Sequence, residues 1–350
     1  MIKREAARIA VVGVGPIGQR HLHAMAAEAT TEAVAIVDPS PVGAEIAGQL
    51  QLPSFTDLET MLDQVSPDGV IIATPNTYHV PLALRCIARG VPVLVEKPIA
   101  DTVEGAGQLA AAAAAADISV LVGHHRRHNP IIQQARKIVQ GGELGQVLAI
   151  SATWLVRKPD DYFNVAWRRE PGGGPILINL IHDIDNLRFI AGEIAAVQGM
   201  TSSRARGFAV EDTAAMLLRF ESGALATVML SDKVAAPWSW ELTAGERTSY
   251  DFPRTGQDCY LFAGTKASLA LPSLRMWRHD GAQDWQSPLP ETQITIPEED
   301  PIRRQAAHFA AVIQGRATPI TTAGDATRTL EATLAVRQAA AEGTLVELTP

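Results

Sequence analysis

The sequence predicts a two-domain α/β protein, with a doubly wound parallel sheet followed by an open, mostly antiparallel sheet that carries helices. Short apolar runs alternate with helical segments up to residue 123, which is typical of a parallel sheet covered by helices. After residue 196 strand patterns follow one another without intervening helices, which indicates antiparallel pairing. We place the first domain at residues 1–126 and the second at residues 127–350.

Composition excludes several classes of partner. The chain has 350 residues and a net charge of −8, so nucleic acids and anionic membranes are not expected as partners. Cys86 and Cys259 lie far apart and outside any C-x-x-C, which argues against a disulfide framework or a thiolate metal site. We find no apolar run near the roughly 20 residues of a membrane span and no signal-peptide pattern. We therefore expect a cytoplasmic protein.

The first strand, residues 8–12, leads into Gly13-Val14-Gly15-Pro16-Ile17-Gly18, a G-x-G-x-x-G motif. In this motif the first glycine permits a tight turn, the second lets phosphates approach the backbone, and the third lets the helix pack closely. The second strand, residues 33–37, ends in Asp38, about 20 residues beyond the motif. A carboxylate there would accept hydrogen bonds from the adenosine ribose and repel a 2′-phosphate. The pattern thus favours NAD over NADP.

The alternation of strands and helices continues to the end of the first domain. Helices are expected at 44–50, 58–65, 79–88 and 102–116, and strands at 69–73, 91–95 and 118–123, the last as the sixth strand of the sheet. Thr74-Pro75-Asn76 and His79 follow one strand, and Glu96-Lys97-Pro98 follows the next. Ligands bind beyond the carboxyl ends of parallel strands, so these groups are expected at the cofactor site.

The second domain carries the candidate substrate residues. A polar, aromatic loop at 158–164 precedes Trp167-Arg168, and Gly172-Gly173-Gly174 open a helix predicted over 175–191. Strands are expected at 145–156, 197–203, 212–221, 224–231, 239–243 and 259–263, and two closing helices at 303–314 and 323–341. Trp238 and Trp240, spaced two apart at the start of the strand expected at 239–243, would share one face of the sheet.

With these motifs placed, the chain resembles the Gfo/Idh/MocA family, the glucose–fructose oxidoreductase and inositol dehydrogenase group. The resemblance rests on the glycine loop, Ala73-Thr74-Pro75-Asn76-x-x-His79, Glu96-Lys97-Pro98, the triple glycine and His182-Asp183-x-Asp185. It implies that Lys97 contacts cofactor and substrate, that a cis peptide precedes Pro98, and that His182 lies near the nicotinamide. It also implies an open second-domain sheet used to form homodimers or homotetramers.

One position departs from the family pattern. Dehydrogenases of the family that act on polyols usually carry an aspartate four residues before the helix histidine, where this chain has Ile178. Asn179 lies on a neighbouring part of the same helix face, and its amide can orient a hydroxyl but cannot take up a proton. The usual Lys–Asp–His set is therefore reduced to Lys97 and His182, and the substrate class is open.

The chemistry expected of these two residues is hydride transfer between a nicotinamide and a hydroxyl or carbonyl carbon of a sugar, cyclitol or related small molecule. His182 would act as general base, and Lys97 would stabilise the developing alkoxide. The cofactor-binding candidates are Gly13, Gly15, Pro16, Ile17, Gly18, Asp38, Thr74, Pro75, Asn76, His79, Glu96 and Lys97. The substrate-binding candidates are Lys97, Arg127, Tyr162, Trp167, Arg168, Asn179, His182 and Asp185.

Three other interpretations stay open at the level of sequence. The same fold could serve a glycoside hydrolase that uses tightly held NAD for transient oxidation, or a non-catalytic sensor of dinucleotides or sugars. His124, His125 and His128 could hold a metal together with His182 and Asp185, but histidines beside a cofactor cleft also serve as hydrogen-bonding groups. We expect no metal.

Overall fold

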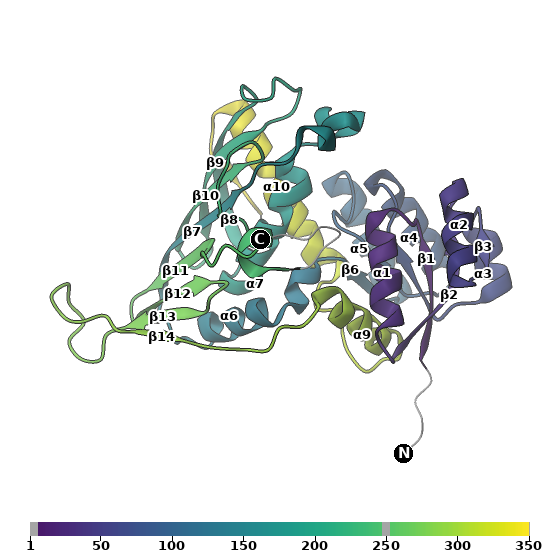
Figure 1. The fold of residues 1–350 in the computed structure, drawn as a ribbon, viewed down its shortest axis with the longest axis horizontal. Coiled ribbons are helices and arrows are strands. Elements are labelled where there is room, and N and C mark those ends of the chain that lie inside the picture. Colours follow the sequence, from purple (N-terminus) through teal and green to yellow (C-terminus); the bar gives the residue numbers. More distant parts are fainter. Residues whose placement is uncertain (1–5, 247–252, 350) are drawn as a thin grey trace, which may run out of the picture. The chain divides into compact units, whose positions relative to one another are not determined.

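The computed structural model describes residues 6–246 and 253–349. The described chain forms two compact units (Figure 1). The first unit contains the chain up to His128 together with Asp300–Leu330, and the second contains Asn129–Glu299 and the chain from Glu331 onward. Residues 300–330 therefore pack with the first unit. The predicted division into residues 1–126 and 127–350 placed them in the second domain.

The first unit is built on a six-stranded parallel sheet with the strand order β3-β2-β1-β4-β5-β6. Its strands are β1 (Ala7–Val12), β2 (Thr31–Val37), β3 (Ser54–Phe55), β4 (Gly69–Ile72), β5 (Val93–Val95) and β6 (Val120–Val122). Its helices are α1 (Pro16–Ala26), α2 (Pro41–Leu50), α3 (Leu58–Val65), α4 (His79–Ala88), α5 (Val103–Ala116) and α9 (Pro301–Ile313), with 3₁₀ turns at Asn76–Tyr78 and His125–His128. The predicted doubly wound parallel sheet is confirmed.

Helix α9 belongs to the first unit because its apolar face completes that unit's core. Phe309 is fully buried and joins the cluster that contains Val11, Ile71 and Leu94 of the central strands. Asp300 caps the helix by accepting a hydrogen bond from the Ile302 N–H at 3.0 Å. Burial of an apolar helix face, rather than position in the chain, decides with which unit α9 packs.

The second unit contains a nine-stranded sheet with the order β14-β13-β12-β11-β7-β10-β9-β8-β15. The β7–β10 pair is parallel and the other pairs are antiparallel. The strands are β7 (Val147–Leu155), β8 (Ile194–Ser202), β9 (Thr213–Phe220), β10 (Leu225–Ser231), β11 (Tyr260–Gly264), β12 (Ala267–Leu271), β13 (Arg275–Arg278), β14 (Glu291–Gln293) and β15 (Val346–Glu347). The expected open, mostly antiparallel sheet is thus present.

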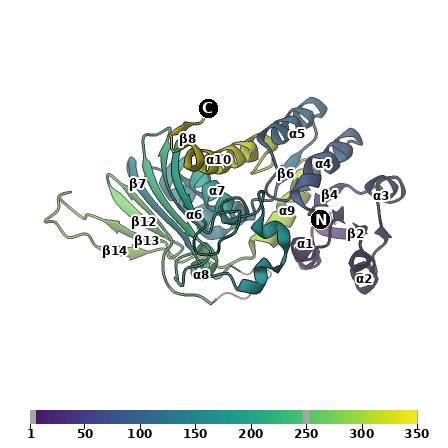
Figure 2. The same cartoon turned by 90° about the horizontal axis from the view of Figure 1, so that it is seen from above.

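Helices cover one face of this sheet (Figure 2). They are α6 (Pro130–Gln140), α7 (Ile181–Ala191) and the second half of α10 (Ala323–Glu342), while α8 (Trp240–Ala244) follows β10. Alternation along β9, and along β10 up to Leu230, buries every second side chain, as expected for a sheet with one covered face. Among the residues described, no helix is long and apolar enough to cross a membrane.

Two local predictions for the second unit need correction. The segment predicted as a strand at 239–243 forms the short helix α8, because Ser239 caps it by accepting a hydrogen bond from the Leu242 N–H. Trp240 is consequently fully buried while Trp238 is 43% exposed, so the two rings do not share a sheet face. The helix predicted over 175–191 begins as a π-helical turn, Ile176–Leu180, before it becomes α7.

Candidate functional site

The glycine loop between β1 and α1 has the close packing that the motif predicts. Gly13 has φ of +87°, and a Cβ there would lie 2.7 Å from the Ala73 carbonyl oxygen. A Cβ on Gly18 would lie 2.0 Å from the Gly13 carbonyl oxygen, so only glycine lets α1 start this close to the loop. A Cβ on Gly15, in contrast, would meet no atom within 4 Å. Gly15 precedes Pro16 and Ile17 at the N-terminus of α1, and the open space beside it suits a phosphate.

Asp38 ties the end of β2 to this loop. Its Oδ2 accepts a hydrogen bond from the Val14 N–H at 3.0 Å, and its Oδ1 accepts bonds from the Ser40 N–H and hydroxyl at 2.8 and 2.6 Å. Burial alone would raise the pKa of this carboxyl, but the hydrogen bonds from Ser40 and Val14 outweigh burial and hold it below its ordinary value. Asp38 is therefore an ionised acceptor beside the glycine loop.

His79 joins the two loops that follow β4 and β5. Its Nδ1 lies 2.8 Å from the Pro98 carbonyl oxygen and its Nε2 lies 2.8 Å from the Thr74 carbonyl oxygen. Burial lowers the pKa of this imidazole, although both carbonyl contacts oppose the shift. In this arrangement His79 fixes the position of the loop Thr74-Pro75-Asn76 relative to Pro98. The cis peptide implied before Pro98 is present.

The carboxylate of Glu96 points into the protein and not along the strand toward open space. Its Oε1 lies 2.7 Å from His21 Nε2 of α1, and its Oε2 accepts a bond from the Lys97 N–H at 3.1 Å. Burial would raise the pKa of Glu96, but the hydrogen bond and charge of His21 lower it overall. A Cβ on Gly123 would come within 2.8 Å of this carboxyl group, which explains a glycine at the end of β6. Lys97, half-buried, follows directly at the tip of β5.

Arg127, predicted as a substrate contact, is buried within the first unit. It pairs with Asp325 at the start of α10, and its Nη1 donates to the Ile320 carbonyl oxygen at 3.3 Å. The neighbouring His128 ring packs against His308, and burial lowers the pKa of His128 to about 3. Among the described residues, no three His, Cys, Asp or Glu side chains are grouped so that they could hold a metal ion.

In the second unit, Lys158 and Asn179 form a contact that the sequence did not indicate. Lys158 Nζ donates to Asn179 Oδ1 at 2.6 Å and lies 4.6 Å from the centre of the Tyr162 ring. Burial lowers the pKa of Lys158 to about 8, against the attraction of Asp232 and Glu241. Within the described chain no carboxylate lies at ion-pair distance from this ammonium, so its direct polar partner is a neutral amide.

The loop that carries Lys158 is held by two arginines. The Arg206 guanidinium stacks on Phe163 at 3.9 Å, and its Nε donates to buried Asp232 at 2.7 Å. Arg168 lies 3.9 Å from the centre of the Tyr162 ring and donates to the Tyr162 carbonyl oxygen at 2.7 Å. Tyr162 and Arg168 thus stack on each other, whereas Trp167 is 51% exposed.

Helix α7 carries the remaining candidates. His182 is 7% exposed, and Asp183 and Asp185 are each 1% exposed. Asp183 accepts a hydrogen bond from the Tyr260 hydroxyl of β11, and Asn186 donates to the same hydroxyl at 3.2 Å. The helix is therefore anchored to the sheet through Asp183 and Asn186, one residue from each of the two predicted site residues, His182 and Asp185.

A parallel sheet with a glycine loop after its first strand and a carboxylate after its second defines a dinucleotide-binding protein. The chain belongs to the Gfo/Idh/MocA oxidoreductase family. Residues 7–124 match the oxidoreductase family with an NAD-binding Rossmann fold, and residues 132–270 match the Gfo/Idh/MocA C-terminal domain.

Three curated relatives show how far the similarity extends. The 1,5-anhydro-D-fructose reductase of Ensifer adhaerens is 28% identical over 84% of this chain and 84% of its own length. The rhizopine catabolism protein MocA of Rhizobium meliloti is 31% identical over 53% of this chain and 57% of its own length. The 2,7-anhydro-N-acetylneuraminate hydratase of Escherichia coli is 29% identical over 62% of this chain and 60% of its own length. The match therefore spans less than two thirds of the last two proteins.

Solved structures share the whole fold. An oxidoreductase from Agrobacterium radiobacter, solved with NAD⁺, L-tartaric acid and magnesium, has a TM-score of 0.81 and 21% identity over 97% of this chain and 98% of its own. Levoglucosan dehydrogenase, solved with NADH and levoglucosan, has a TM-score of 0.79 and 20% identity over 99% of this chain and 100% of its own.

The open space at Gly15 gives a test of dinucleotide binding that does not depend on the substrate. We expect Gly15→Ala to weaken NADH binding by about tenfold or more, because the methyl group occupies the place of a phosphate oxygen, while the melting temperature of the protein without ligand stays unchanged. Gly48→Ala in α2 also meets no atom within 4 Å and serves as the matched control. Titration followed by NADH fluorescence measures the NADH affinity of both variants. Equal affinity in the two variants would contradict the placement of the pyrophosphate.

Proposed function

We propose that this protein is an NAD-dependent oxidoreductase that transfers a hydride between the nicotinamide and a hydroxyl or carbonyl carbon of a sugar, cyclitol or related small molecule. The observation that carries the proposal is the combination of an intact glycine loop and Asp38 with Lys97 at the tip of β5. The reductase and dehydrogenase names of its relatives support it.

NAD is the expected dinucleotide, and NADP is less favoured. The ionised Asp38 would accept bonds from ribose hydroxyls and would repel a 2′-phosphate. No Lys or Arg occurs between Arg20 and Arg85 to offset that repulsion. When bound, NAD supplies the hydride acceptor, and NADH the donor. Gly13, Gly15 and Gly18 would admit its phosphates.

Lys97 and His182 are proposed to divide the proton chemistry. In the oxidation direction the carbinol C–H bond breaks and its electron pair leaves with the hydride, while the hydroxyl proton passes to the His182 imidazole. Lys97 would hydrogen-bond the same oxygen and stabilise its developing negative charge. In the reduction direction His182 returns the proton to the carbonyl oxygen.

Lys158 and Asn179 are proposed to bind the oxygens of the substrate that do not react. Two N–H donors of the Lys158 ammonium remain after its bond to Asn179, and the half-buried site strengthens charge-assisted hydrogen bonds. Relatives that carry an aspartate before the helix histidine have a carboxylate in this part of the site. This chain has the Lys158 ammonium, hydrogen-bonded to the Asn179 amide. That charge favours substrates that carry a carboxylate over uncharged polyols.

Outward-facing leucines on the sheet of the second unit support a homo-oligomer. Leu217, Leu225 and Leu261 lie on neighbouring or nearby strands and are 54%, 59% and 50% exposed. They line a shallow apolar hollow of about 430 Å³. Contiguous exposed apolar surface of this kind marks an interaction site, so we propose that a second copy of the chain covers it in a dimer or tetramer.

A second candidate function is lyase or hydrolase chemistry that uses bound NAD transiently. The match to the 2,7-anhydro-N-acetylneuraminate hydratase of Escherichia coli favours this alternative. Such an enzyme would retain NAD through purification and convert its substrate without net NADH formation. A protein that binds NAD but converts nothing in either assay would instead be a sensor on this fold.

The oxidoreductase proposal is tested by screening the purified protein with NAD against sugars, cyclitols and sugar acids, following nicotinamide absorbance. With the substrate found, we expect His182→Ala to lower kcat by about 10²–10⁴-fold and Lys97→Met to lower kcat/KM comparably. Exposed His23→Ala and Lys137→Met serve as matched controls and should retain wild-type rates. Full turnover in either site variant would exclude the assigned roles.

The lowered pKa of Lys158 gives a pH prediction. Because this pKa is about 8, the ammonium loses its proton as pH rises through that value, and we expect the substrate KM to rise above pH 8. In Lys158→Arg the guanidinium stays charged, so the rise in KM should disappear, while the effect of His182 on kcat remains. A KM that does not respond to pH in the wild-type protein would contradict substrate binding by Lys158.

The proposed interface predicts a change of mass. We expect Leu217→Glu combined with Leu261→Glu to convert the oligomer into monomers, because charges would be buried without partners. Leu50→Glu, on an equally exposed leucine of α2, is the control. Light scattering after size-exclusion chromatography measures the mass. A wild-type monomer, or an unchanged oligomer in the double variant, would refute the assignment.

A further inference from the structure

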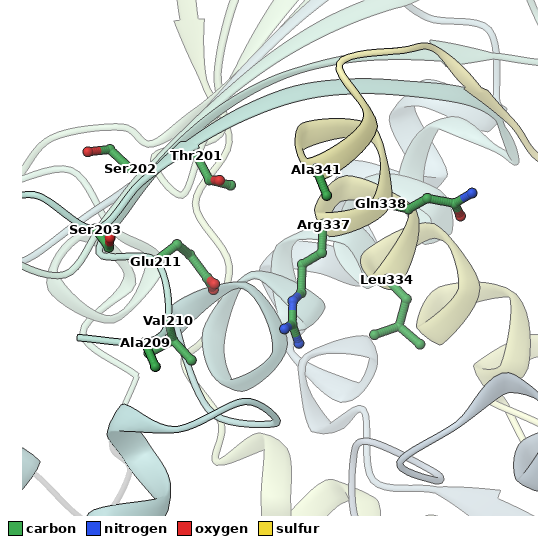
Figure 3. Close-up of a pocket in the computed structure, with 10 residues that line it drawn as sticks. All are labelled: Thr201, Ser202, Ser203, Ala209, Val210, Glu211, Leu334, Arg337, Gln338 and Ala341. Atoms are coloured by element: carbon green, nitrogen blue, oxygen red, sulfur yellow. The ribbon is translucent and has the colours of Figure 1, made fainter. Parts of the chain in front are cut away.

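A polar pocket lies in the second unit beyond the end of β8, outside the residues assigned to cofactor and substrate. Its volume is about 560 Å³, within the range of small-molecule sites. The end of β8 and the loop to β9 line one side, and the C-terminal half of α10 lines the other. Figure 3 shows Glu211 on the loop and Arg337 on the helix with their charged groups directed toward the same space.

Arg337 makes no hydrogen bond and no ion pair with any residue in the described part of the chain, although it is half-buried. Its backbone position is well fixed, because Val336 beside it is fully buried and its carbonyl oxygen lies against Gly199 of β8. A guanidinium offers five N–H donors in a planar fork that matches a carboxylate. An anchored arginine without a protein partner, facing a cavity, is a recognition group for an anion.

Glu211 faces Arg337 but is engaged elsewhere. Its Oε1 accepts a hydrogen bond from the Ile176 N–H at 2.9 Å, and a Cβ on Gly174 would lie 2.6 Å from the same oxygen. No ion pair joins Glu211 to Arg337 among the described side chains, so the two charges stand apart across the pocket. Burial raises the pKa of Glu211, against the attraction of the Ile176 N–H and Arg337. Its free acceptor capacity is available to a ligand hydroxyl.

We propose that this pocket is a second binding site, for a small organic acid that carries hydroxyl groups. The carboxylate would bind Arg337, and the hydroxyls would bind Glu211 and the Ser203 hydroxyl on the side of the pocket opposite α10. The site does not depend on the function proposed for Lys97 and His182. It is connected to that function through Glu211, because Ile176 begins the π-helical turn that carries Asn179 and leads into α7.

D-Gluconate is the probe, and D-glucitol, which has the same chain length without the carboxylate, is the matched ligand control. Isothermal titration calorimetry is carried out on the full-length wild-type protein and on Arg337→Gln, Arg337→Lys, Arg204→Gln and Lys97→Met. We expect gluconate and not glucitol to bind, with affinity reduced about tenfold or more in Arg337→Gln and less in Arg337→Lys. Arg204 is exposed on the same loop and outside the pocket lining, so its variant should bind as wild type does.

Lys97→Met separates this site from the proposed catalytic one. Retained gluconate binding in Lys97→Met together with its loss in Arg337→Gln supports a second site. Loss in Lys97→Met with retention in Arg337→Gln would place gluconate at the catalytic site and overturn the proposal. Absence of gluconate binding to the wild-type protein, or equal binding of glucitol, would overturn the assigned ligand class. Unchanged melting temperatures establish that each variant is folded.

Discussion

The buried carboxylate of Glu96 holds together the end of the parallel sheet at which Lys97 stands. It lies between the His21 ring of α1 and the Lys97 N–H, and it fills the space that a side chain on Gly123 would need. A buried ionised group is tolerated only when it is paired, and removal of one partner typically costs several kcal/mol. The same interaction therefore stabilises the sheet end and restricts the backbone from which Lys97 extends.

Hydrogen bonds to backbone groups fix the other parts of the two candidate sites in a similar way. His79 contacts the carbonyl oxygens of Thr74 and Pro98, and Asp38 accepts the Val14 N–H. In the second unit, Glu211 accepts the Ile176 N–H at the start of the turn that leads to His182. In each case a side chain from another element contacts a backbone group of a loop or of a helix start. Loops fixed in this manner lose little conformational freedom when they bind a ligand.

Five of the six strands of the parallel sheet could be predicted from sequence, because each is an apolar run followed by a glycine or proline signal. The two-residue strand β3 (Ser54–Phe55) carries no such run and was not predicted. The features that depend on tertiary contacts could not be predicted from sequence. Residues 239–243 read as a strand, but the Ser239 cap and the burial of Trp240 produce a helix. Glu96 and Arg127, both predicted to contact ligands, are instead paired with His21 and Asp325 inside the first unit. The Lys158–Asn179 contact joins residues 21 positions apart on different elements, so no local sequence pattern predicts it.

Ile178, which stands where polyol dehydrogenases of the family usually carry an aspartate, directly precedes Asn179, the partner of Lys158. An aspartate at this point of the turn would compensate a nearby cation, whereas here the turn offers an amide acceptor and Lys158 keeps its charge without a carboxylate at ion-pair distance, within the described residues. The charge of the Lys158 ammonium is therefore balanced, in the part of the chain that the structure describes, only by the carboxylates of Asp232 and Glu241, which lie beyond ion-pair distance. Under the function proposed above, this partly desolvated ammonium would favour a ligand that carries a carboxylate, because such a group restores part of the solvation that the ammonium has lost. The absence of an aspartate at Ile178 and the Lys158–Asn179 hydrogen bond together explain why the Lys158 ammonium has no carboxylate as a direct partner.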